Sequence, residues 1–280
     1  MSKLFVVGTP IGNLGDFSPR ALQCLKDCDF IAAEDTRVTA KLLHHFGLSK
    51  PMVSYHEHNR RVCGDKIAAR LLAGETCALV TDAGMPAISD PGEDLVALCR
   101  DSGIAVESVP GPTAFATALA VSGFPSGRFT FEGFLSVTKR TRAEHLKTLA
   151  GETRTMLFYE APHKLPYTLR DFAAHFGERP LAIVRELTKF HEEVIRTTCA
   201  AAAEHYGPDN PDVPALKGEI VLVLAGTSPV QEEAVPLEAA VALAREYVAQ
   251  GISQGEAAKR AAKETGRRRN EIYAEMIADQ

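Results

Sequence analysis

The sequence predicts an α/β protein in two sheet-containing parts followed by a small helical module, and three patterns carry this prediction. Short β-rich runs alternate with helical runs up to residue 123, which predicts a mainly parallel sheet with helices on both faces. Beyond Phe124-Pro125-Ser126-Gly127 the strand signals move closer together, which predicts a mixed sheet with fewer helices. From Leu237 onward the pattern is entirely helical. We therefore expect domains at 1–123, 124–228 and 237–280.

The first part carries clear start and stop signals for its helices. Ser18-Pro19 opens a helix, since serine is a good N-cap and proline fits the first helical position. We expect Thr36 to cap a helix that ends at Gly47. The expected strands of this part are 3–9, 30–33, 52–56, 77–81 and 106–109.

The second part contains one pair of strands whose direction the spacing determines. The expected strands are 129–135, 155–160, 181–186, 192–197 and 219–224. Only Leu187–His191 separates the third strand from the fourth, which is too short for a crossover helix, so this pair must be antiparallel. After an acidic linker that begins at Thr227-Ser228-Pro229, Ser253-x-x-Glu256 predicts a capping box, and Gly266 separates the last two helices.

Composition excludes several classes of protein. The chain of 280 residues is 45% hydrophobic and 24% charged, as in ordinary globular proteins. The N-terminal apolar run is too short for a signal peptide, and we find no apolar stretch of membrane-spanning length. Six cysteines without a C-x-x-C pair point to a reducing cytoplasm. A net charge of −5 argues against nucleic-acid binding over the whole surface but permits a local basic patch.

Three loops rich in glycine and proline follow predicted strands of the first part. They are Gly8-Thr9-Pro10-Ile11-Gly12-Asn13-Leu14, Asp82-Ala83-Gly84-Met85-Pro86 with Ser89-Asp90-Pro91-Gly92, and Pro110-Gly111-Pro112-Thr113-Ala114. Open α/β sheets bind ligands at the carboxyl ends of their strands. The first loop departs from G-x-G-x-x-G, and Pro10 has no N–H to donate, so a phosphate cradle is not expected there. The missing G-x-G also disfavours a class I Rossmann methyltransferase.

These three loops resemble the tetrapyrrole (corrin/porphyrin) methylase superfamily, the class III methyltransferases. Further runs resemble the ribosomal RNA small subunit methyltransferase I family within it. Those runs are Phe131-Glu132-Gly133-Phe134-Leu135, Phe158-Tyr159-Glu160-Ala161-Pro162-His163-Lys164, Arg185-Glu186-Leu187-Thr188-Lys189 with Glu192-Glu193, and Gly218-Glu219-Ile220-Val221. One departure is that Ser136-Val137, without a proline, precede the basic string Lys139-Arg140-Thr141-Arg142.

The resemblance implies a fold of two α/β domains, usually in a homodimer, with S-adenosylmethionine bound between them. It implies 2′-O-methylation of a cytidine in the decoding centre of 16S ribosomal RNA, with the small ribosomal subunit as partner. The residues that it implies for the cofactor are Pro10, Asp82, Ala83, Gly84, Pro86, Ile88, Gly111, Thr113, Ala114, Leu135, Ala161 and Pro162.

A ribose hydroxyl is a poor nucleophile at neutral pH, so a base or a charged neighbour should help to remove its proton. The candidate catalytic residues are Glu34, Asp35, Glu186 and Lys189, a lysine with a lowered pKa being a reasonable base. Glu160 and His163 are further candidates. Each has a structural alternative: Asp35-Thr36 can be a helix N-cap, and Arg185 and Glu186 can form an ion pair.

RNA binding needs contacts from lysine and arginine to phosphates. We expect the substrate-binding residues to be Lys139, Arg140, Arg142, His163 and Lys164. Arg267-Arg268-Arg269 is a second basic cluster, on helices that could dock RNA or pack a dimer. The alternative for either basic cluster is a solvent-exposed surface that binds no RNA. No metal site is expected, because His44-His45 point to different faces of a helix and His56-x-His58 has no nearby cysteine or carboxylate cluster.

Two other functions compete with RNA methylation. One is a small-molecule methylase of the same superfamily that acts on a corrin or porphyrin precursor. The basic string after Gly133-Phe134-Leu135 and the helical C-terminus speak against it. The other is a non-catalytic cofactor-sensing or RNA-binding protein. Its signature would be cofactor loops interrupted by bulky residues, and none is seen in the three loops.

Overall fold

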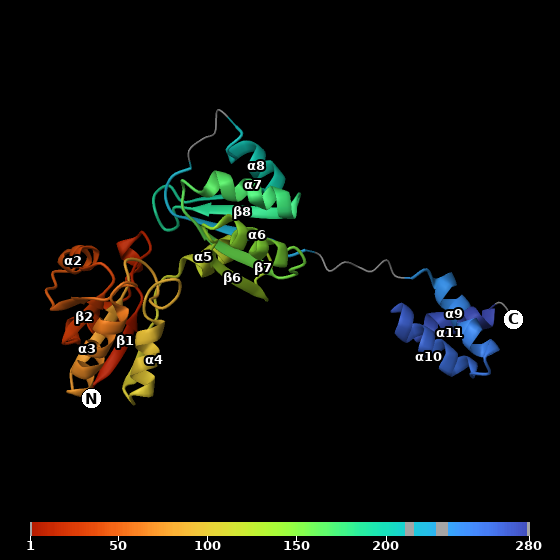
Figure 1. Cartoon of the computed structure of the whole chain (residues 1–280), viewed down its shortest axis with the longest axis horizontal. Helices are drawn as coiled ribbons and strands as arrows, with labels where there is room; N and C mark the ends of the chain where they lie inside the picture. Colours follow the sequence, from red (N-terminus) through yellow and green to blue (C-terminus); the bar gives the residue numbers. More distant parts are fainter. Residues whose placement is uncertain (1, 211–215, 228–234, 279–280) are drawn as a thin grey trace. The chain divides into compact units, whose positions relative to one another are not determined.

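The computed structural model describes residues 2–210, 216–227 and 235–278. The chain forms two compact units, Met1–Gly226 and Thr227–Gln280 (Figure 1). Unit 1 holds both β-sheets, and unit 2 is helical among its described residues. Most of the expected acidic linker, residues 228–234, lies outside the described residues.

The first sheet of unit 1 is fully parallel, as predicted. Its strands run in the order β3-β2-β4-β1-β5, and every pairing between neighbours is parallel. The strands are β1 (Lys3–Val7), β2 (Phe30–Ala33), β3 (Met52–Ser54), β4 (Thr76–Val80) and β5 (Ala105–Val109). All of β2 and all but the first residue of β4 are buried, as expected for strands covered on both faces.

Helices cover both faces of this sheet. They are the 3₁₀ helix η1 (Leu14–Asp16) and the α-helices α1 (Pro19–Asp27), α2 (Thr36–His45), α3 (Arg60–Leu72) and α4 (Glu93–Asp101). One buried cluster joins the sheet to α3 and α4, and another joins it to α1 and α2. Ser18 caps α1 as predicted. The prediction for α2 was wrong by one residue, because the Asp35 side chain accepts the Arg37 N–H and Thr36 is the first helical residue.

The second sheet is mixed, as predicted. Its order is β6-β7-β10-β8-β9, with β6 and β7 parallel and the other pairings antiparallel. The strands are β6 (Phe129–Phe134), β7 (Thr155–Glu160), β8 (Pro180–Arg185), β9 (Glu193–Thr198) and β10 (Ile220–Leu224). The β8–β9 hairpin confirms the antiparallel pair that its short connection predicts.

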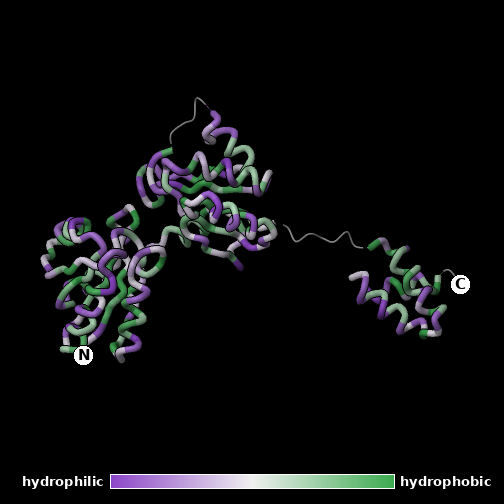
Figure 2. The backbone as a smooth tube through the Cα atoms, viewed as in Figure 1, coloured by the Kyte–Doolittle hydropathy of each residue, from purple (hydrophilic) through white to green (hydrophobic). Residues whose placement is uncertain are grey.

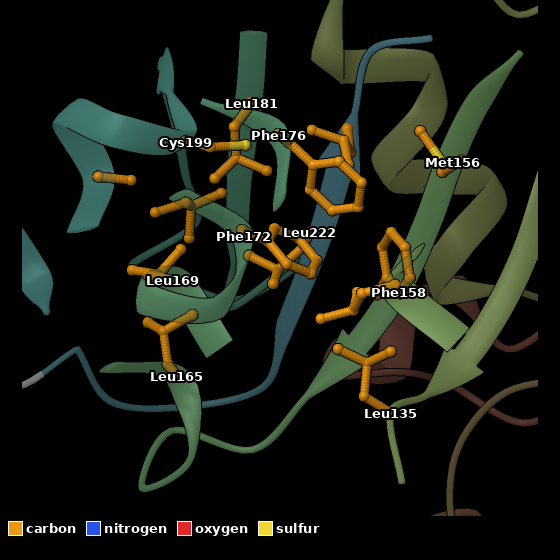
Figure 3. Packing of buried hydrophobic residues seen from close by; sticks show 14 of the residues in the cluster. Leu135, Met156, Phe158, Leu165, Leu169, Phe172, Phe176, Leu181, Cys199 and Leu222 are labelled. Carbon is orange, nitrogen blue, oxygen red and sulfur yellow. The ribbon is translucent and has the colours of Figure 1, made fainter. Parts of the chain in front are cut away.

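Each face of the second sheet packs on its own set of helices. One face forms a core with α6 (Lys139–Thr148), α7 (Leu165–Phe176) and α8 (Cys199–Tyr206), in which Phe172 contacts Phe158 and Phe176 (Figure 3). The other face packs on α5 (Ala114–Ser122). This helix leaves the last strand of the first sheet, yet its buried Ala118 and Leu119 belong to the core of the second sheet. Helix α5 therefore connects the two sheets within unit 1.

Unit 2 consists of α9 (Leu237–Ala249), α10 (Gln254–Thr265) and α11 (Arg269–Ala278) around a small, alanine-rich core. Hydrophobic and hydrophilic residues alternate along these helices (Figure 2). Gly266, with φ +69°, ends α10 as predicted. Ser253 is the N-cap of α10, but its side chain makes no capping hydrogen bond, so the capping-box prediction was wrong in that detail. Across the described residues of both units, no helix combines the length and apolar character needed to cross a membrane.

Candidate functional site

The three glycine- and proline-rich loops meet at the carboxyl edge of the first sheet. The N–H of Thr9 donates to the Gly84 carbonyl at 2.9 Å, and the Gly84 N–H donates to the Thr9 carbonyl at 3.2 Å. The third loop packs against the first so closely that a Cβ on Gly111 would lie 2.8 Å from the Gly8 Cα. Glycine is therefore required at 8 and 111 because the loops touch one another.

A cavity of about 350 Å³ opens beside these loops, which we call the apolar cavity. It lies within unit 1, and both sheets contribute to its wall. Its lining residues are Ile11, Ala83, Gly84, Met85, Ile88, Ser89, Asp90, Thr113, Ala114, Phe134, Tyr159, Glu160, Ala161, Pro162, Leu187, Gly218, Glu219, Ile220 and Val221. A mostly apolar wall with a few polar groups, and a volume of several hundred Å³, is typical of a small-molecule site.

The structure brings together seven of the twelve residues expected to hold the cofactor. Ala83, Gly84, Ile88, Thr113, Ala114, Ala161 and Pro162 line the apolar cavity, whereas Pro10, Asp82, Pro86, Gly111 and Leu135 do not. Asp82 instead accepts the Asp35 N–H at 3.1 Å. Leu135 is buried in the core beneath α6 and α7.

Sequence reasoning missed the part of the wall that β10 supplies. Strand β10 pairs antiparallel with β7 so that Ile220 lies opposite Glu160. This register places the start of β10 beside the Glu160-Ala161-Pro162 run, and Gly218 to Val221 line the cavity as a result. The run Gly218-Glu219-Ile220-Val221 stands out in the sequence, but its position depends on a pairing between distant strands.

Strained backbone borders the apolar cavity. Four non-glycine residues among those described have positive φ: Ala87 at 66°, Ser89 at 64°, Glu186 at 52° and Thr188 at 66°. They lie in two loops that both supply lining residues. Such conformations are uncommon for residues with a side chain, and they cluster at functional sites. Both loops therefore hold strained backbone at the wall of the apolar cavity.

A second cavity, of about 510 Å³, adjoins the first, and we call it the polar cavity. It is lined by Glu34, His56, Glu57, His58, Arg60, Ala87, Ser89, Asp90, Pro91, Gly92 and Glu93. Ser89 and Asp90 line both cavities. Glu34 and Asp90, which are distant in the sequence, line this cavity together with the His56-x-His58 run. Among the described residues, however, no group of these side chains is placed to hold a metal ion.

Two of the predicted bases, Asp35 and Lys189, have neighbours that favour their charged forms. Asp35 caps α2 and lies 2.6 Å from the Arg37 guanidinium, and its hydrogen bonds with Arg37 lower its pKa to about 2. The Lys189 amino group lies 2.9 Å from Glu186 and 3.1 Å from Glu219. Burial alone would lower the pKa of Lys189, but hydrogen bonds to both carboxylates outweigh it and the pKa is raised. The lowered pKa that a lysine base needs is therefore not found at Lys189, whose two carboxylate partners favour its charged form.

The remaining carboxylates differ in their readiness to take a proton. The hydrogen bond from Lys189 lowers the pKa of Glu186, which makes it a weaker base. Burial raises the pKa of Glu34, and the charges of Asp82 and Asp35 add to this effect. Burial and the charges of Glu34 and Asp82 raise the pKa of Asp90 to about 6. Asp90, which was not among the candidates, is therefore the carboxylate best tuned for a base near neutral pH.

The basic string splits into surface and structural residues. Lys139 and Arg140 are exposed at the start of α6, where Arg140 pairs with Glu144. Arg142 is only 13% exposed, and its guanidinium donates to Asp171 at 2.5 Å and to the Thr168 hydroxyl at 2.8 Å. Arg142 is therefore held inside unit 1. His163 and Lys164 directly follow Ala161 and Pro162 of the cavity wall, with His163 exposed.

Comparison with known proteins identifies the family. The family model "Tetrapyrrole (Corrin/Porphyrin) Methylases" matches residues 3–203. "Ribosomal RNA small subunit methyltransferase I" of a Synechocystis species is 45% identical over 98% of this chain and 96% of its own length. The chain belongs to the ribosomal RNA small subunit methyltransferase I family of tetrapyrrole methylases. Its relative of the same name in Pseudomonas aeruginosa is 42% identical over 99% of this chain and 97% of the relative.

A shorter relative and two solved structures match about four fifths of this chain. The Thermotoga maritima relative, also named ribosomal RNA small subunit methyltransferase I, is 46% identical over 226 residues, which cover 81% of this chain and 99% of that protein. Uroporphyrin-III C-methyltransferase from Thermus thermophilus, solved in complex with S-adenosyl homocysteine, has a TM-score of 0.55 at 16% identity over 79% of this chain and 96% of that chain. Diphthine synthase has a TM-score of 0.59 at 14% identity, and the match covers 80% of this chain and 90% of that chain. The two solved structures share the fold.

Proposed function

We propose that this protein transfers a methyl group from S-adenosylmethionine to the 2′-hydroxyl of a cytidine in the decoding centre of 16S ribosomal RNA. The observation that carries the proposal is near-full-length identity of 41–45% to relatives named ribosomal RNA small subunit methyltransferase I. The assembled small ribosomal subunit, in the cytoplasm, is the proposed substrate, and a homodimer is the proposed active form.

The apolar cavity is the proposed cofactor site. Gly84, at φ +86°, presents bare backbone to it, and an added Cβ would lie 3.5 Å from Ile11 and 3.6 Å from the Pro112 carbonyl. Tyr159 adds an aromatic face, and its hydroxyl accepts the Phe115 N–H at 3.3 Å. S-adenosylmethionine has no phosphate, so it needs no row of backbone N–H donors, and Pro10 in the first loop is compatible with it. These residues fit a neutral nucleoside joined to an amino acid.

The chain's contribution to the reaction is alignment and proton removal. The cofactor supplies a methyl group on a sulfonium, a good leaving group, in an in-line displacement. Holding the two reactants in line can contribute about 7–11 kcal/mol to the lowering of the barrier. Lys189 pairs with Glu219 of the cavity wall and carries a positive charge. This charge favours oxygen atoms that bear or gain negative charge, such as an RNA phosphate or the ionising hydroxyl.

The test uses small ribosomal subunits from a strain that lacks this gene, incubated with the purified protein and radiolabelled S-adenosylmethionine. We expect one labelled cytidine whose 3′ internucleotide bond resists alkaline cleavage, because the attacking 2′-hydroxyl is methylated. Deproteinised 16S RNA, tested in parallel, separates the assembled subunit from free RNA as substrate. Label on a base, or transfer only to a tetrapyrrole, would contradict the proposal. Sedimentation equilibrium tests the proposed homodimer independently.

A further inference from the structure

Asp90 occupies the boundary between the two cavities. It is the one titratable residue among those described that lines both the apolar and the polar cavity. It follows Ser89, whose φ is +64°, and precedes Pro91 at the start of α4. A Cβ on the nearby Gly92 would lie 2.9 Å from a methyl carbon of Leu79 and 3.2 Å from the Ala87 nitrogen. The loop therefore holds the Asp90 backbone in a crowded, defined position.

Asp90 is also free to accept a proton, unlike the other carboxylates of the apolar cavity. Glu160 is buried, and its oxygens accept hydrogen bonds from Thr168 and from the Ala161 N–H. Glu219 is paired with Lys189. Asp90 forms no hydrogen bond or ion pair with any residue in the described parts of the chain. A half-buried carboxylate without a partner is costly, so its position calls for a ligand group.

The groups around Asp90 come from several elements. Glu34 and Asp82, at the ends of β2 and β4, are like charges that oppose ionisation of Asp90. Tyr159, at the end of β7, responds to the charge of Asp90 and its own pKa is raised, mainly by burial. His56 and Arg60 face the polar cavity from the segment after β3. Burial, and next repulsion from the two carboxylates, thus keep Asp90 able to bind a proton near neutral pH.

Building on the proposed function, we propose that Asp90 is the general base that removes the proton from the ribose 2′-hydroxyl at the boundary of the two cavities. The O–H bond breaks and its proton passes to the Asp90 carboxylate. The oxygen forms a bond to the methyl carbon, and the electron pair of the broken carbon–sulfur bond stays on sulfur. Asp90 then releases its proton to solvent through the polar cavity.

The test compares the parent with Asp90→Asn and Asp90→Glu in single turnover on small ribosomal subunits at saturating S-adenosylmethionine. Asn is isosteric, no described hydrogen bond is lost and an unpaired charge is removed, so we expect a melting temperature no lower than the parent's and an unchanged cofactor affinity by calorimetry. The rate should fall about 10²- to 10⁴-fold, and Asp90→Glu should recover part of it. Asp101→Asn is the matched control, because Asp101 is exposed at the end of α4 and lines neither cavity; it should keep the parent rate.

A second readout does not depend on turnover. Carboxyl ¹³C NMR of the free protein should show Asp90 titrating near pH 6, with that pKa lowered in Glu34→Gln because a like charge is gone. The methylation rate of the parent should decrease as the pH falls below the pKa of Asp90. In Glu34→Gln this decrease should occur at a lower pH, because the pKa of Asp90 is lower. A parent that methylates the 2′-oxygen while Asp90→Asn is equally fast overturns the role of Asp90 alone. A parent that makes no 2′-O-methyl product overturns the proposed function and the base together.

Discussion

The guanidinium of Arg142 lies 2.5 Å from the carboxylate of Asp171. It also donates to Thr168, whose hydroxyl donates to Glu160 in the wall of the apolar cavity. A residue of the basic string is therefore linked through two hydrogen bonds to the proposed cofactor site. Its neighbour Arg140, 87% exposed, has no such link.

We therefore expect Arg142→Ala to destabilise the protein and to weaken cofactor binding. Removing the arginine leaves Asp171 without its charge partner, at a cost of about 2 kcal/mol. Chemical denaturation and calorimetry with S-adenosylmethionine measure the two effects. Arg140→Ala removes the same side chain from the surface and should change neither quantity measurably. Equal stability of the two variants would show that the Arg142 network is not structural.

Substitution of two loop glycines, Gly84 and Gly111, should affect different properties of the protein. Gly84→Ala adds a Cβ at the cavity and forces φ +86° on alanine, so S-adenosylmethionine affinity should fall about tenfold for a strain of about 1–2 kcal/mol. Gly111→Ala places its Cβ 2.8 Å from the Gly8 backbone, where the two loops pack together. We therefore expect this variant to lower the melting temperature of the protein rather than its cofactor affinity. Calorimetry and thermal denaturation of both variants separate the effects. A loss of affinity in Gly111→Ala without loss of stability would place its glycine at the ligand instead.

The exposed part of the basic string should contribute to RNA affinity. Replacing Lys139 and Arg140 with alanine removes up to two phosphate contacts. Each contact changes the slope of log K against log salt by about 0.7 for single strands and about 0.9 for duplexes. RNA binding measured across salt concentrations should weaken and become less salt-dependent, with cofactor affinity unchanged. Arg268→Ala with Arg269→Ala is the matched control in unit 2, where both are exposed; equal losses would indicate a diffuse field rather than a substrate rim.

The charge of Lys189 should persist on the alkaline side of the pH profile. A group with a raised pKa keeps its proton below that pKa and loses it above, so the cation should remain past its ordinary pKa of 10.5. We expect no fall in rate from Lys189 between pH 7 and about 10. Glu219→Gln removes one of its two partners and should move any alkaline fall to lower pH. Lys189→Met should slow methyl transfer across the whole range, and an unaffected rate would remove Lys189 from the reaction.

Much of the fold and part of the site were predictable because local rules apply to them. Alternating strand and helix signals predict the parallel sheet, and the five residues between two strand signals force the β8–β9 hairpin. Seven cavity residues follow from loops at strand ends and from the family resemblance. The β10 contribution was not predictable, since its register with β7 depends on packing between residues about 60 positions apart.

The sequence by itself determined the order of the elements, the family and the loops that line the proposed cofactor site, because turn chemistry and hydrophobic periodicity are local properties. Tertiary structure decided the chemistry of the individual side chains. Asp35 and Lys189 are unsuitable bases because of neighbours that hold their charges, and Arg142 is buried against Asp171. Asp90 becomes a candidate only when burial and two carboxylates from other strand ends surround it. Ionisation depends on solvent exposure and on charges close in space, and folding alone sets both.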